Sequence, residues 1–173
     1  AIKHCHPHLI ADEEFVAMFL DEARLAARIH HPNVVPTLDV GQSDVLYLVM
    51  EYVEGDTLSR LIREARRTNA SMPVDVVLRI AVDALAGLQA AHELRDGKGN
   101  PLRVVLRDVT PQNVIVGVDG VARILDFGIA TAASRSTTTK EGHVKGKLGY
   151  MAPEQLGGEE ASPGTDVYAL GVV

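Results

Sequence analysis

Two short apolar runs between residues 114 and 125 flank the dipeptide Asp119-Gly120. An Asp-Gly pair between apolar runs is a strong local signal for a β-hairpin with a two-residue loop. With that loop, Asn113 and Asp126 lie directly opposite each other at the open end of the hairpin. Their side-chain oxygens are the kind of hard ligand that Mg²⁺ takes beside substrate phosphates. The hairpin therefore predicts a divalent metal site formed by Asn113 and Asp126.

A third polar side chain is expected at the same end of the hairpin. Asp108 precedes Asn113 by five residues, and the intervening Thr110-Pro111 predicts a tight bend. Turn formation or helix capping explains each of the polar residues singly, but it does not explain their spacing. We therefore expect Asp108, Asn113 and Asp126 to converge on one site.

The rest of the chain predicts a mixture of helices and strands. Apolar residues recur every three or four positions over 12–30, after a plausible cap at Asp12, and again over 74–94. The run 45–53 is typical of a buried strand, and the polar stretch 131–149 is typical of a long loop. The fold class is therefore predicted to be α+β. The face of 74–94 that we expect to be buried holds Val77, Ala81, Ala84, Leu85, Leu88 and Ala91.

Composition limits the classes of function. The chain has 173 residues, 46% of them hydrophobic, which suits one domain or two small lobes. Its formal net charge of −6 disfavours general nucleic-acid binding. No apolar run reaches the roughly 18 residues of a membrane span, and the single Cys5 cannot form an internal disulfide. We expect a protein of the reducing cytoplasm, cut from a longer chain because it begins at Ala1 and ends in an apolar stretch.

Several motifs together resemble one family. Residues 106–113 (Leu-Arg-Asp-Val-Thr-Pro-Gln-Asn) resemble the catalytic loop of protein kinases, 126–128 (Asp-Phe-Gly) their metal-binding triplet, and 152–154 (Ala-Pro-Glu) the end of their activation segment. Lys3, Glu22 and Asp166 match further family positions in order and spacing. The whole chain thus resembles the catalytic domain of eukaryotic-like bacterial Ser/Thr protein kinases.

The resemblance implies a fold and an activity. The fold would be the two-lobe kinase fold, truncated at both ends, with residues 1–53 in the partial small lobe and 54–173 in the partial helical lobe. The activity would be transfer of the ATP γ-phosphate to Ser and Thr hydroxyls of protein substrates, with Mg²⁺ as the metal. Neither a nucleic-acid partner nor a membrane segment is expected within this chain.

The resemblance also implies catalytic roles. Asp108 would accept or orient the proton of the substrate hydroxyl, and Asn113 and Asp126 would hold Mg²⁺. Lys3, paired with Glu22, would contact the α and β phosphates. Catalysis would then consist of positioning and charge neutralisation.

The nucleotide base would lie against the segment that follows the strand at 45–53. Met50 would be the gatekeeper, and the backbone of Glu51 and Val53 would read adenine. Ala1 and Ile115 would sandwich the adenine ring.

Two further roles follow from the resemblance. Asp56 would reach the ribose of the nucleotide. Arg107, which precedes Asp108, marks kinases in which this arginine holds a phosphate of the activation loop. We therefore expect autophosphorylation in trans within Ser134–Thr139.

Three positions depart from the family pattern. Leu106 replaces a histidine, although a leucine can fill the same apolar slot. Thr110 stands where a lysine is usual, and Lys147 stands where a threonine is usual. Lys147 is therefore predicted to reach Asp108 and the γ-phosphate as part of a reciprocal exchange, and the alternative is that it faces an acidic peptide substrate.

The departures motivate a second class of function. A pseudokinase that binds nucleotide or a partner without phosphotransfer is the alternative suggested by Leu106 and Thr110. Kinase-like proteins that have lost phosphotransfer tend to lack one of the catalytic residues. The chain retains all of them, namely Lys3, Glu22, Asp108, Asn113 and Asp126, and this favours an active kinase.

Overall fold

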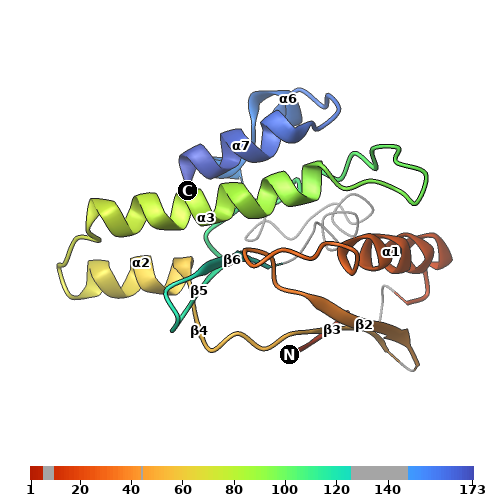
Figure 1. Cartoon of the computed structure of the whole chain (residues 1–173), viewed down its shortest axis with the longest axis horizontal. Helices are drawn as coiled ribbons and strands as arrows, with labels where there is room; N and C mark the ends of the chain where they lie inside the picture. Colours follow the sequence, from red (N-terminus) through yellow and green to blue (C-terminus); the bar gives the residue numbers. More distant parts are fainter. Residues whose placement is uncertain (6–9, 44, 126–147) are drawn as a thin grey trace.

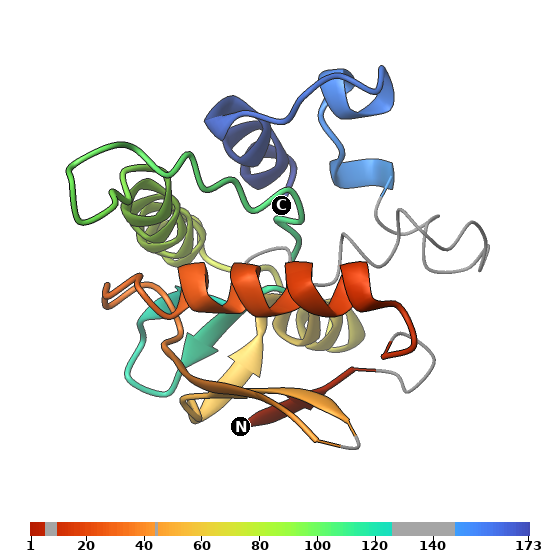
Figure 2. The same ribbon diagram turned by 90° about the vertical axis from the view of Figure 1, so that its right-hand side faces the viewer.

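The computed structural model describes residues 1–5, 10–43, 45–125 and 148–173. It contains two small antiparallel sheets and a set of helices, as the predicted α+β class requires (Figures 1 and 2). None of the helices in these ranges is long and apolar enough to cross a membrane.

The first sheet is covered by one helix. Its strands are β1 (Ile2–His4), β2 (Thr37–Gln42) and β3 (Leu46–Met50), in the order β1-β3-β2. Helix α1 (Glu13–Ala26) lies across this sheet (Figure 2). Its buried phenylalanines pack against the buried leucines of β3. The predicted cap is confirmed, because Asp12 Oδ1 accepts a 3.1 Å hydrogen bond from the Phe15 N–H.

The second sheet adjoins the longer helices. Its strands are β4 (Gly55–Thr57), β5 (Val114–Gly117) and β6 (Ala122–Ile124), in the order β4-β5-β6. Helices α2 (Leu58–Arg67) and α3 (Val74–His92) pack on it through a core of Leu58, Ile80, Val114 and Ala122. Residues 51–54 connect the two sheets. The division into lobes at residue 53 remains a prediction.

Two more helices complete the described structure. Helix α6 (Pro153–Leu156) follows a short 3₁₀ turn at Leu148–Tyr150, and α7 (Pro163–Val172) packs on α3. Figure 1 shows α3 between α7 on one side and α2 with the second sheet on the other.

The hairpin has a different register from the one predicted. Val114 pairs with Ile124, and the Gly117 N–H donates to the Val121 carbonyl at 3.0 Å, so the loop has three residues. Gly120, with φ of +75°, occupies the left-handed position that such a loop requires. Asn113 therefore faces Leu125, whose N–H donates to the Asn113 carbonyl at 2.8 Å. The expected pairing of Asn113 with Asp126 is wrong by one residue.

The buried face of α3 is also rotated from the predicted one. Ala84, Leu88 and Ala91 are buried as expected, but Val77 and Leu85 are 47% and 42% exposed. Ile80, Asp83 and Gly87 share the buried face instead. This rotation lets Asp83 accept a 3.0 Å hydrogen bond from the Ala122 N–H. It also brings Gly87 so close to the Asn33 carbonyl that an added Cβ would lie 2.5 Å from that oxygen.

Candidate active site

The loop that precedes β5 brings Asp108 and Asn113 together. Leu106 and Val109 are buried in the core that α3 and α7 share, which fixes the path of the loop. The Asn113 Nδ2 donates to the Asp108 carbonyl oxygen at 2.9 Å and to the Asp108 carboxylate at 3.2 Å. Because Nδ2 makes both bonds, the Asn113 Oδ1 is the atom of this amide that is suited to a cation such as Mg²⁺. The donor chemistry therefore fits the predicted metal.

A buried carboxylate on α7 holds the same loop in shape. The Asp166 carboxylate accepts hydrogen bonds from the backbone N–H groups of Leu106 at 2.9 Å and Arg107 at 2.8 Å. The His92 Nε2 lies 2.7 Å from Asp166 Oδ2. These contacts stabilise Arg107 in the left-handed region, with φ of +65°. Asp108 follows Arg107 directly, so its position depends on these contacts.

The predicted end of the activation segment lies against this loop. The Gln155 Nε2 donates to the Arg107 carbonyl at 3.2 Å, while its Oε1 accepts from the Ala152 N–H at 3.1 Å. Gln155 thus joins the start of α6 to the residue before Asp108. An open surface hollow lies here, lined among others by Asp108, Thr110, Tyr150 and Gln155.

Glu154, the last residue of the Ala-Pro-Glu motif, joins α6 to α7. The Thr165 Oγ1 donates to Glu154 Oε1 at 2.7 Å. This hydrogen bond lowers the pKa of the Glu154 carboxyl. The motif is therefore anchored to the same helix that carries Asp166.

Lys3 and Glu22 lie on neighbouring elements. Lys3 is on β1 opposite Leu48, and Glu22 is half-buried on α1. The expected ion pair between Lys3 and Glu22 is not formed among the described residues, and Glu22 Oε2 is buried without a hydrogen-bond partner. Burial raises the pKa of the Glu22 carboxyl, and the nearby charge of Arg107 opposes that rise. Glu22 is thus a half-buried acid whose ionised form is incompletely compensated in this structure.

The predicted adenine-binding residues lie in or beside the two sheets and on the segment that connects them. The Met50 N–H donates to the Ala1 carbonyl at 2.8 Å, and Ala1 N donates to the Met50 carbonyl at 2.6 Å. The Glu51 N–H donates to the Pro36 carbonyl at 3.0 Å, so the carbonyl of Glu51 is its backbone group suited to a ligand. Val53 and Ile115 are half-buried, on the connecting segment and on β5.

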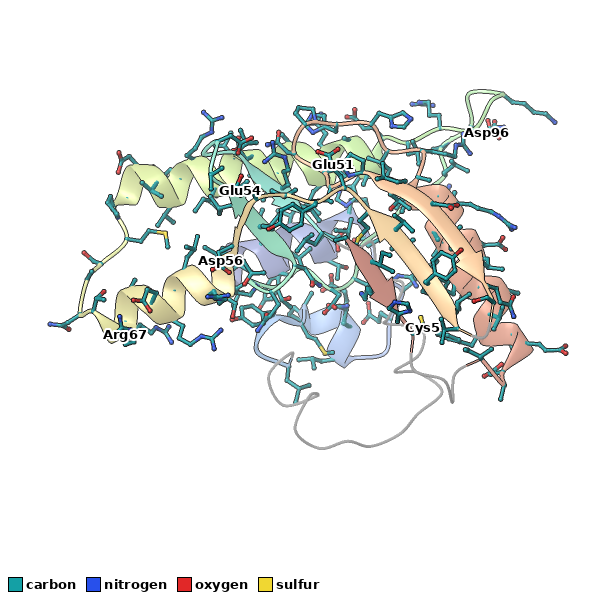
Figure 3. All side chains as sticks on the ribbon, turned by 90° about the horizontal axis from the view of Figure 1, so that it is seen from below. Cys5, Glu51, Glu54, Asp56, Arg67 and Asp96 are labelled. Atoms are coloured by element: carbon teal, nitrogen blue, oxygen red, sulfur yellow. The ribbon has the colours of Figure 1, made fainter. Side chains whose placement is uncertain are left out.

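Asp56 already has partners at the start of α2. Its carboxylate accepts from the Thr57 N–H at 2.9 Å and pairs with Arg60 Nε at 3.1 Å. Figure 3 shows Asp56 on β4, directly after the connecting segment that carries Glu51 and Glu54. A ribose hydroxyl at Asp56 would therefore compete with Arg60.

Several predicted residues lie outside the described ranges. They are Asp126 of the metal pair, Lys147, the phosphorylation segment Ser134–Thr139 and most of the predicted loop 131–149. Their roles stay predictions.

The comparison with known families decides the family. The family model described as the protein kinase domain matches residues 1–173, the whole chain. The chain belongs to the protein kinase domain family. The expected resemblance to protein kinases is therefore confirmed.

Relatives of this kinase domain are bacterial kinases. It is 46% identical over 172 residues to the tyrosine-protein kinase MasK of Myxococcus xanthus, covering 99% of this chain and 27% of MasK. It is 37% identical to the serine/threonine-protein kinase PrkC of Bacillus subtilis, covering 100% of this chain and 25% of PrkC. It is 36% identical to the serine/threonine-protein kinase PknA of Mycobacterium tuberculosis, covering 100% of this chain and 39% of PknA. The chain thus spans well under half the length of these relatives.

Solved structures confirm the two-lobe kinase fold. A crystal structure of the Mycobacterium tuberculosis PknI kinase domain matches with a TM-score of 0.72 and 30% identity, covering 98% of this chain and 59% of that chain. A second crystal structure of the same domain matches with a TM-score of 0.71 and 30% identity, covering 98% of this chain and 57% of that chain.

Sequence reasoning missed two positioning side chains of this kinase domain. His92 on α3 contacts Asp166, whose carboxylate binds the backbone of the 106–113 loop, and Gln155 on α6 contacts Arg107 in that loop directly. Neither stands in a periodic pattern that would single it out. The nearest signals were the adjacent motifs, since Gln155 directly follows Ala-Pro-Glu.

Proposed function

We propose that the protein containing this chain transfers the γ-phosphate of ATP to hydroxyl groups of protein substrates. The observation that carries the proposal is the contact of Asp108 with Asn113 on a loop that Asp166 and Gln155 hold. This arrangement suits phosphoryl transfer, in which a protein contributes positioning and electrostatic stabilisation. The cytoplasm, where ATP is available, is the proposed location.

Each reacting group has a proposed partner in the chain. The substrate hydroxyl oxygen bonds to the γ-phosphorus, the bond from that phosphorus to the β–γ bridging oxygen breaks, and the hydroxyl proton passes to Asp108. Asn113 and Asp126 would hold Mg²⁺, which supplies neutralisation of phosphate charge. Lys3 would contact the α and β phosphates once Glu22 turns toward it. This assignment leaves Arg107 to bind a phosphate on the activation segment.

Serine and threonine hydroxyls are the first proposed acceptors, because PrkC and PknA are named serine/threonine kinases. Tyrosine is the second candidate. It is favoured by the 46% identical MasK, which is named a tyrosine kinase, and by Thr110, which replaces the usual lysine of Ser/Thr kinases.

The experiment is a transfer assay on the full-length gene product. The protein is incubated with γ-³²P-labelled ATP, Mg²⁺ and a general protein substrate, and the labelled product is hydrolysed for phosphoamino-acid analysis. We expect phosphoserine and phosphothreonine. Phosphotyrosine alone would support tyrosine as the acceptor. ATP binding without transfer would support the pseudokinase alternative.

Autophosphorylation in trans within Ser134–Thr139 is proposed as part of the same activity. An Asp108→Asn copy of distinct length is mixed with the wild-type protein and labelled ATP. Label within 134–139 of the Asp108→Asn copy is the expected result. Label only on the wild-type copy would contradict transfer in trans.

A further inference from the structure

Helix α2 concentrates positive charge in a chain that is negative as a whole. Its ten residues include four arginines and one glutamate, which gives a formal charge of +3, whereas the whole chain has −6. Two apolar residues of α2 at helical spacing, Leu58 and Ile62, pack with residues of the second sheet. All four arginines of the helix are exposed. This arginine face consists of Arg60, Arg63, Arg66 and Arg67.

Part of the positive charge of the arginine face is not neutralised. Arg60 pairs with Asp56 at 3.1 Å and Arg67 pairs with Glu64 at 2.6 Å, and both arginine side chains stay about 70% exposed. Arg63 and Arg66 form no ion pair with any residue in the described ranges. Two guanidinium groups are therefore available to an external anion.

The arginine face begins at the catalytic loop. The Ser59 N–H in the first turn of α2 donates to the Pro111 carbonyl at 2.9 Å, and Pro111 lies between Asp108 and Asn113. A helix rises 1.5 Å per residue, so Arg63 and Arg66 lie about 6 and 10 Å farther along the axis than Ser59. In Figure 3, α2 runs outward from the Asp56 label to the Arg67 label. A peptide whose hydroxyl lies at Asp108 can therefore pass beside this helix.

We propose that the arginine face of α2 binds acidic residues of the protein substrate, about two to three residues from the hydroxyl that is phosphorylated. The proposal rests on the proposed phosphotransfer and adds the substrate class. An extended peptide advances about 3.3 Å per residue, which matches the span from the catalytic loop to Arg63 and Arg66. Guanidinium groups suit carboxylates because they can donate two parallel hydrogen bonds. The contact of α2 with the catalytic loop favours a substrate peptide over a nucleic acid or a membrane.

The test compares two double variants of the full-length protein. Arg63→Gln with Arg66→Gln removes two charges from the arginine face and keeps good helix formers. The matched control, Arg24→Gln with Lys98→Gln, removes two charges from exposed positions on α1 and in the loop after α3. Substrates are three peptides with the same acceptor, carrying Glu before the acceptor, Glu after it, or Gln at both places.

The expected result is a selective change in KM. The wild-type protein and the control should have a KM about tenfold lower for one Glu peptide than for the Gln peptide, and the arginine variant should lose this preference. The preference should also fade at about 0.5 M NaCl, because exposed charges are screened within a few ångströms there.

Three outcomes would overturn the inference. Equal KM values of the wild-type protein for Glu and Gln peptides would show that α2 selects no acidic substrate. A preference that survives in the arginine variant would place the selecting residues elsewhere. Binding of anionic vesicles or single-stranded RNA that depends on Arg63 and Arg66, without any peptide preference, would assign the face to that partner. Transfer neither to the peptides nor to a general protein substrate would instead reject the proposed phosphotransfer.

Discussion

The Asp166 carboxylate fixes the backbone of Arg107, because its Oδ1 accepts a 2.8 Å hydrogen bond from the Arg107 N–H, and Arg107 has φ of +65°. A residue other than glycine is disfavoured at such a φ unless surrounding contacts stabilise it. Asp166 is 1% exposed and supplies one such contact from α7. The geometry of the catalytic loop is therefore set by a residue about sixty positions away in the sequence.

Replacing Asp166 tests this relationship. Asp166→Asn places an amide N–H group where one of the backbone N–H groups now donates, so the loss of charge-assisted bonds should cost about 3 kcal/mol of unfolding free energy. We expect kcat to fall at least tenfold, because Asp108 loses its position. Urea unfolding and the transfer assay measure both effects. The control Glu160→Gln changes an exposed carboxylate and should alter neither, and a fully active Asp166→Asn protein would contradict the role.

Gln155 offers a test of the second anchor. Gln155→Leu removes the bonds to the Arg107 carbonyl and to the Ala152 N–H, which should cost about 1–2 kcal/mol of unfolding free energy and lower kcat several-fold. Gln155→Glu keeps an acceptor for Ala152 but sets a carboxylate against the Arg107 carbonyl. We therefore expect Gln155→Glu to lower kcat while the KM for ATP is unchanged. If both variants match the wild-type kcat, Gln155 does not position the loop.

The raised pKa of the Glu22 carboxyl predicts that the stability of the fold depends on pH. Burial raises the pKa of its carboxyl from 4.5, so the folded protein retains the Glu22 proton at pH values where the unfolded chain has lost it. Ionisation of Glu22 therefore destabilises the fold as pH rises above about 4.5. Glu22→Gln, which cannot ionise, should unfold at higher urea concentration than the wild type at pH 7, and this gain should shrink toward pH 4.5.

The same variant should be a poorer enzyme. Gln cannot form an ion pair with Lys3, so we expect Glu22→Gln to lower kcat at least tenfold if Glu22 turns to Lys3 during transfer. Equal stability of the two proteins at all pH values would contradict the presence of an incompletely compensated carboxylate at Glu22. Unchanged kcat would exclude the proposed pairing.

The exchange hypothesis for Lys147 and Thr110 predicts that swapping the two residue types restores the transfer rate. If Lys147 acts on the γ-phosphate, Lys147→Ala should lower kcat about tenfold or more, whereas loss of a contact with an acidic substrate should mainly raise the peptide KM. The swap Thr110→Lys with Lys147→Thr should then recover much of the rate. Steady-state kinetics of the full-length protein separates the two hypotheses, and an unchanged kcat in Lys147→Ala would reject the exchange.

The sequence predicted correctly those features that depend on local signals alone. Asp12 precedes an apolar repeat and caps α1 as expected, and Asp108 and Asn113 meet because a short loop closes between them. The hairpin register failed because Asp119-Gly120 also suits a three-residue loop, in which Gly120 takes the left-handed position. Local propensity does not distinguish the two loops.

Other features depend on tertiary contacts. The face of α3 is set by Asp83, a charged residue that is buried because it bonds to the Ala122 N–H from a distant strand. Helix α2 and strand β4 were not predicted. Helix α2 has only a short apolar repeat among its arginines, and β4 forms by pairing with β5. Patterns along the chain carry no information about such partners.

The most direct test of the account is phosphoryl transfer by Asp108→Asn in the full-length protein. Single-turnover transfer from labelled ATP to a protein substrate is measured together with nucleotide binding. We predict that the single-turnover rate constant for transfer falls by about two to four orders of magnitude, because the acceptor of the hydroxyl proton is lost, while the affinity for ATP changes by less than about threefold. Transfer by Asp108→Asn at the wild-type rate would contradict the assignment of this loop as the catalytic centre.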